Sequence, residues 1–90
     1  MLPEAEVKVV GKIYSGKVIR VEDCFVSDET LLDLRVCDVE RKDMNEKMPE
    51  CILSEGREML FEKRGMYRIT VSFLDQNDVS GKRHFYIYVK

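Results

Sequence analysis

Three oxygen-bearing side chains stand close together in a short polar segment near the end of the chain. Asp75, Asn77 and Asp78 occupy the run Asp-Gln-Asn-Asp at positions 75–78. Carboxylate and amide oxygens are the ligands that a hard cation such as calcium prefers. The same residue types favour turns, because their side chains hydrogen-bond to local backbone groups. The segment therefore supports two interpretations, a calcium site and a hairpin turn, and the turn needs no further ligands.

The three cysteines and the single histidine match no reactive or metal-binding motif. Cys24, Cys37 and Cys51 lie 13 and 14 positions apart, which fits neither a redox pair nor a zinc site. Their odd number leaves at least one thiol outside any intrachain disulfide, which disfavours a secreted disulfide scaffold. His84 has no nucleophile motif beside it to activate. We therefore expect buried, apolar cysteines, no cofactor, no metal and no enzymatic activity.

Two tyrosines near the end of the chain are candidates for a binding surface. Tyr86 and Tyr88 alternate with apolar residues, so they should point away from the core of a final strand. Two outward tyrosines form a flat amphipathic platform that suits a protein partner or a sugar. The alternative is cross-strand packing against long side chains such as those of Arg68 or Lys82.

The elements that position these residues are predicted to be short β-strands. Apolar and polar residues alternate through 67–73 and again through 85–89, and the polar run 75–81 between them suits a hairpin loop. The predicted inward residues of this hairpin are Ile69, Val71, Phe73, Phe85, Ile87 and Val89. Earlier strand candidates carry the apolar sets Ala5/Val7/Val9, Ile19/Val21, Leu32/Leu34/Val36 and Met59/Phe61. Residues 40–50 are mostly polar, and we expect a solvated loop there, with a short helix as the alternative.

Composition limits the classes of partner. The 90 residues suit one domain, residues 1–90, and the formal net charge of -2 has no basic block, so nucleic acid is not an expected partner. No apolar run approaches the length that spans a bilayer, and the first residues lack the pattern of a signal peptide. The compartment stays open, because the chain can be one domain of a larger protein.

A family resemblance rests on residues 61–75 and 85–89. The strand Gly65-Met66-Tyr67-Arg68-Ile69, which runs into an aspartate turn and an apolar last strand, resembles bacterial and phage immunoglobulin-like modules of the PKD-like and HYR-like kind. Residues 16–23 and 27–30 are similar to the second strand and the loop after it. The strand candidates, which must bury their apolar faces between sheets, already predict an all-β, two-sheet sandwich of about seven antiparallel strands, and the resemblance implies an immunoglobulin-like form of it. The resemblance also implies a tyrosine corner, in which Gly65 permits a tight entry and the Tyr67 hydroxyl bonds upstream backbone.

Three functions follow as expectations. The first is a non-catalytic structural or adhesive module of a bacterial surface or phage particle protein, which spaces or presents other domains. The second is a module that binds a protein or carbohydrate through Tyr86 and Tyr88, with carbohydrate weaker because the chain has no tryptophan. The third is an intracellular immunoglobulin-like interaction domain, which unpaired cysteines favour, although the closing Ser-Pro-Phe of filamin-type repeats is missing.

Overall fold

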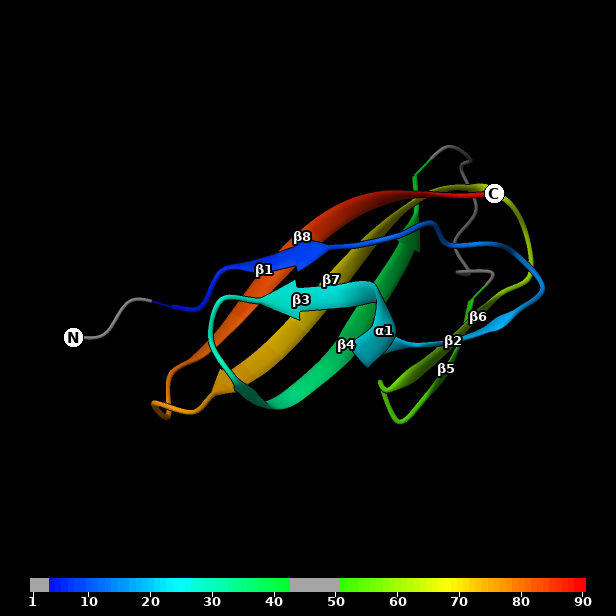
Figure 1. Cartoon of the computed structure of the whole chain (residues 1–90). Coiled ribbons are helices and arrows are strands. Elements are labelled where there is room, and N and C mark those ends of the chain that lie inside the picture. The colour runs from blue at the N-terminus through cyan, green and yellow to red at the C-terminus, as the bar shows by residue number, and fades with distance from the viewer. Residues whose placement is uncertain (1–3, 43–50) are drawn as a thin grey trace.

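The protein is built almost entirely from antiparallel β-structure, as the alternating sequence predicts (Figure 1). The computed structural model describes residues 4–42 and 51–90. Their elements are β1 (Val7–Val9), β2 (Val18–Arg20), α1 (Val21–Cys24), β3 (Phe25–Ser27), β4 (Leu31–Arg41), β5 (Cys51–Ser54), β6 (Glu58–Phe61), β7 (Gly65–Asp75) and β8 (Ser80–Val89). These strands form three sheets, ordered β1-β3, β2-β6-β5 and β4-β7-β8.

The longest sheet, β4-β7-β8, forms one layer of the molecule. The strands β7 and β8 make the predicted hairpin and stay in register from Gly65 opposite Val89 to Leu74 opposite Ser80. The alternation of β7 directs Tyr67, Ile69, Val71 and Phe73 to the core, where each is at most 3% exposed. In β8, Ile87 and Val89 are buried too, while Phe85 is half-buried and packs against the core.

The two smaller sheets form the second layer, and one continuous segment of the chain contributes a strand to each of them. The segment β2-α1-β3 runs in one direction across this layer (Figure 1). Before α1 the chain pairs with β6, and the N–H of Val21 donates to the carbonyl of Arg57 at 2.8 Å. After α1 it pairs with β1, and Cys24 accepts from the N–H of Val10 at 2.8 Å. The single helical turn thus marks the point at which the chain changes its neighbour.

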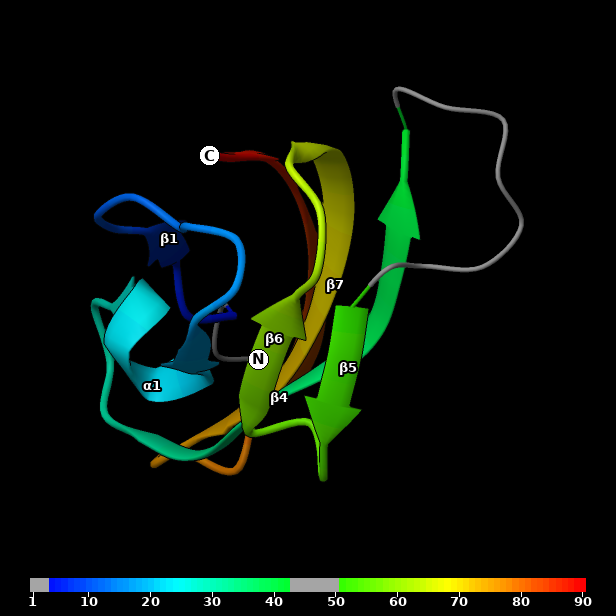
Figure 2. The same cartoon turned by 90° about the vertical axis from the view of Figure 1, so that its right-hand side faces the viewer.

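Both small sheets pack on the same face of the long sheet. The ring of Phe25 in β3 lies 5.2 Å from that of Phe85 in β8, and Phe61 in β6 lies 4.8 Å from Tyr67 in β7. Figure 2 shows α1 and β1 on one side of β6 and β5 on the other, in accordance with the sheet order. The apolar core between the layers includes Ile13, Val21, Met59, Phe61, Tyr67, Ile69, Val71 and Val89.

The turn between β5 and β6 ties the second layer to β4. Glu55 and Gly56 both have positive φ, and the N–H of Arg57 donates to the carbonyl of Ser54 at 2.9 Å, as in a type I′ turn. The carbonyl of Gly56 accepts from the N–H of Val36 at 2.8 Å. A Cβ atom on Gly56 would lie 2.8 Å from the Val36 carbonyl oxygen, so the close approach requires glycine.

Three details of the predicted strands are wrong. Val21 belongs to α1 rather than to a strand with Ile19, because one helical turn carries the chain from β6 to β1. Leu32 does not share a face with Leu34 and Val36, since a register shift between Leu31 and Asp33 leaves Leu32 65% exposed. The predicted loop at 40–50 begins too early, because β4 continues to Arg41. Its residues 43–50 lie outside the described part of the chain.

Candidate functional site

The outer face of β4-β7-β8 carries the two candidate tyrosines. Tyr86 and Tyr88 are 65% and 55% exposed, as expected from their alternation with inward residues of β8. Across the strand pair, Tyr88 lies opposite Met66 and Tyr86 lies opposite Arg68. Arg68 is therefore a cross-strand neighbour, as the alternative of cross-strand packing predicts. More than half of each tyrosine side chain is nevertheless open to solvent.

A third tyrosine extends this surface from a distant part of the sequence. Ile13 pairs in parallel with Val89, and the N–H of Ser15 donates to the carbonyl of Lys90 at 2.7 Å. Because Ile13 and Val89 are both buried, the neighbouring Tyr14 lies on the outer face, the face that Tyr88 occupies. Tyr14 is 49% exposed. We call the surface of Tyr14, Tyr86, Tyr88 and Met66 the tyrosine face. The sequence did not predict Tyr14, because no local pattern of residues indicates that residues 13–15 lie beside the last strand.

Arg68 borders the tyrosine face and is held by acidic residues of β4. Its Nη2 lies 2.6 Å from Glu40 Oε2 and 3.9 Å from Asp38 Oδ2. Its Nε is buried and has no hydrogen-bond partner in the described part of the structure. These ion pairs fix the guanidinium at the edge of the tyrosines. The face therefore presents exposed tyrosines beside an arginine that two carboxylates hold in place. Tyrosine and arginine are both enriched in protein interfaces.

His84 and Cys37 also lie on the outer face, where both contact Thr70. The Nδ1 atom of His84 is 2.8 Å from the hydroxyl of Thr70, and the thiol of Cys37 donates to the Thr70 carbonyl at 3.5 Å. The prediction that all three cysteines are buried holds only for Cys24, since Cys37 is exposed and Cys51 is half-buried. The cause of the exposure of Cys37 is a second register shift in β4, between Val36 and Asp38, which leaves Cys37 outside the regular pairing.

The other two thiols lie in apolar surroundings. Cys24 is buried in the core, where burial, with a smaller effect from Asp23, raises its pKa. Burial raises the pKa of Cys51 to about 11, although a hydrogen bond with the backbone of Leu60 opposes the shift. Since the thiolate is the nucleophile and the metal ligand, both groups stay protonated and unreactive near neutral pH.

The residues of the candidate calcium site form a turn. Asp75 is fully buried, and its Oδ1 accepts hydrogen bonds from the N–H groups of Asn77 at 2.8 Å and Val79 at 3.0 Å. Asn77 and Asp78 are exposed, and Asp78 has a φ of 64°. One carboxylate oxygen of Asp75 thus closes the loop between β7 and β8. Hydrogen bonds from an aspartate side chain to local backbone groups are what the hairpin-turn interpretation predicts.

Tyr67 makes the backbone contact of a tyrosine corner. Its hydroxyl donates to the carbonyl of Lys63 at 2.8 Å, and its side chain is fully buried. Gly65 enters the strand with a φ of 148°, a conformation that only glycine adopts readily. Arg41, which the sequence placed in a solvated loop, is buried here: its guanidinium lies 6.0 Å from the Tyr67 ring and donates to the carbonyl of Arg64 at 2.8 Å.

Removal of the Tyr67 hydroxyl should destabilise the fold without altering its core packing. Tyr67→Phe keeps the ring against Phe61 and leaves the carbonyl of Lys63 without this donor. We expect the free energy of unfolding to fall by about 1–2 kcal/mol, measured by urea denaturation. An unchanged midpoint would contradict a stabilising role for this hydrogen bond.

Within residues 4–42 and 51–90, no group of three histidine, cysteine or acidic side chains is arranged to hold a metal ion. No helix of that region has the length and apolar character to cross a membrane. Comparison of the chain with protein-family models, curated proteins and solved structures finds no match.

Proposed function

We propose that the chain is a non-catalytic, immunoglobulin-like module. Strand order supports this assignment: β1, the collinear β2 and β3, β6 and β5 make one layer, and β4, β7 and β8 make the other. In the immunoglobulin constant-type sandwich, strands A, B, E and D face C, F and G, so β2-α1-β3 corresponds to a strand B that one helical turn interrupts. The hydrogen bond of Tyr67 at the start of β7, in the position of strand F, supports the same assignment.

The role that we propose for this module is adhesive: it binds a protein partner through the tyrosine face. The observation that carries this proposal is the set of three tyrosines, each 49–65% exposed, that strand alternation and the bridge at Ile13 direct to the outer face of β4-β7-β8. Exposed apolar and aromatic groups that gather in one place mark interaction surfaces, whereas scattered ones do not. Tyrosine also contributes contact area at a low cost in conformational entropy. A passive spacer within a larger surface or particle protein would not need this surface.

The double variant Tyr86→Ser/Tyr88→Ser tests the adhesive role. Both side chains lie outside the core, so the fold should persist while association with a partner or a second copy weakens by about thirtyfold. Self-association of the unmodified chain and of the double variant is measured by sedimentation, and binding to a protein partner is measured by titration.

The matched control is Val18→Ser, which removes a 60% exposed apolar side chain from β2 in the opposite layer. It should leave association unchanged. If the double variant loses stability but no association, the tyrosines only support the sheet, and the spacer function replaces the adhesive one.

A further inference from the structure

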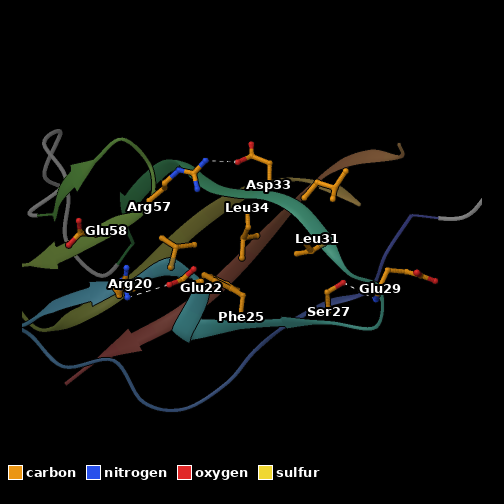
Figure 3. Close-up of a pocket in the computed structure, with 12 residues that line it drawn as sticks. Arg20, Glu22, Phe25, Ser27, Glu29, Leu31, Asp33, Leu34, Arg57 and Glu58 are labelled. Carbon is orange, nitrogen blue, oxygen red and sulfur yellow. Dashed lines mark hydrogen bonds and ion pairs between the residues drawn. The ribbon is translucent and has the colours of Figure 1, made fainter. Parts of the chain in front are cut away.

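A groove of about 460 Å³ opens between the two layers, and none of its lining residues belongs to the tyrosine face (Figure 3). One wall is formed by α1 and β3 and the other by the first half of β4. Phe25, Leu31 and Leu34 contribute apolar side chains to the groove, and Phe25 and Leu34 point toward one another across it. Leu32 stands 65% exposed at its margin. The groove therefore combines these apolar side chains with a larger polar lining and a mouth that is open to solvent.

The edge of β3 that faces the groove lacks a partner strand. Among the described residues, β3 pairs only with β1. The carbonyl of Cys24 and the N–H of Asp28 both bond to the β1 side, so alternation directs the backbone groups of Ser27 to the groove. The next strand of this layer, β6, begins only at Glu58. Just before it, the carbonyl of Arg57 accepts from the N–H of Val21, and the carbonyl of Gly56 bonds to Val36 of β4. The position beside β3 that a longer β6 would fill is open.

The charges around the groove favour a basic occupant. Four acidic residues line it against two arginines. Arg57 pairs with Asp33 at 3.1 Å, and Arg20 pairs with Glu22 at 3.5 Å. The other two acidic side chains, Glu29 and Glu58, lie at opposite ends of the groove, and neither is paired with a cation among the described residues, although Glu29 Oε2 accepts from the amide of Gln76 at 2.8 Å (Figure 3). A ligand along the groove therefore meets a carboxylate at each end.

We propose that this groove binds an extended peptide segment of a partner protein, which adds to β3 as an antiparallel strand. Strand addition satisfies the open backbone edge with main-chain hydrogen bonds, and alternate side chains of the peptide supply specificity. The peptide places apolar side chains against Phe25 and Leu34 and basic side chains near Glu29 and Glu58. This surface is separate from the tyrosine face, so the module has two distinct contact sites.

Selection from randomised peptides of about nine residues, which span roughly 30 Å when extended, tests the proposal on the intact chain. Enriched peptides should alternate apolar and polar residues and carry lysine or arginine toward their ends. In nuclear magnetic resonance spectra, a bound peptide should shift the amide of Ser27 and show cross-strand contacts with β3. Selection of no peptide, or of peptides that shift the tyrosine face instead, overturns the proposal.

Two variants block the groove by independent means. Ser27→Pro removes the N–H that faces the groove, and Leu32→Asp places a charge on an already exposed position at its margin. Each should weaken peptide binding at least about tenfold, and Leu32→Asp keeps the test valid if Ser27→Pro fails to fold. Tyr86→Ser/Tyr88→Ser should bind the peptide normally, which separates this proposal from the adhesive function. Equal affinity for Leu32→Asp and the unmodified chain contradicts the proposed site.

Discussion

Phe61→Ala is expected to lower the free energy of unfolding by about 3–5 kcal/mol. The Phe61 ring is fully buried between the layers and makes an edge-type contact with the Tyr67 ring at a centroid distance of 4.8 Å. Its loss removes apolar burial, leaves a cavity and ends an aromatic contact at the junction of β6 and β7. Since a small domain has only about 5–15 kcal/mol of stability in total, urea denaturation should show a large decrease in midpoint.

Two further variants make this result interpretable. Phe61→Leu keeps much of the side-chain volume and should cost clearly less than the alanine variant. Glu62→Ala changes an exposed neighbour and should leave stability within about 0.5 kcal/mol of the original. If Phe61→Ala cost no more than Glu62→Ala, the contact between β6 and β7 would not be a main source of stability.

The strands that the sequence predicts best are those whose alternation is long and uninterrupted. In β7 the run from Tyr67 to Phe73 specifies strand, inward face and hairpin partner, and all four inward residues are buried. Prediction fails where the chain departs from a period of two. The register shifts that expose Leu32 and Cys37 insert single residues into β4, and the turn α1 interrupts a strand at Val21. These irregularities depend on which strands become neighbours, and local residue pattern does not specify this.

The residues of the candidate surfaces also differ in how well local sequence pattern predicts them. Tyr86 and Tyr88 follow from the alternation of one strand, whereas Tyr14 joins them only through parallel pairing between segments more than 70 residues apart. The groove is still less predictable, because it arises from the short length of β6 and the divergence of β3 from β4. Arg41 was missed for a different reason, because a charged residue in a polar run is expected to be exposed. It is buried because its guanidinium donates to the carbonyl of Arg64 and lies over the ring of Tyr67.

Asp75→Ala should destabilise the protein by about 3 kcal/mol, because two partly buried N–H groups, those of Asn77 and Val79, lose their charged acceptor. Asp75→Asn retains an acceptor oxygen and should cost less, about 1 kcal/mol. Thermal or urea denaturation measures both. Similar stability of Asp75→Ala and the unmodified chain would mean that this carboxylate does not hold the loop between β7 and β8.

The same variants distinguish a turn from a calcium site. An ion that binds only the folded state stabilises it by RT ln(1 + [L]/Kd), so about 10 mM calcium chloride would raise the midpoint even for a weak site. Asp78→Asn is the matched control, since asparagine tolerates the positive φ at this exposed position and removes one candidate ligand. Oδ1 of Asp75 already accepts two backbone N–H groups, and its Oδ2, which has no hydrogen-bond partner among the described residues, is buried away from solvent. We therefore expect calcium to leave all midpoints unchanged and Asp78→Asn to be neutral. A calcium-dependent rise that both asparagine variants abolish would instead assign these residues to an ion.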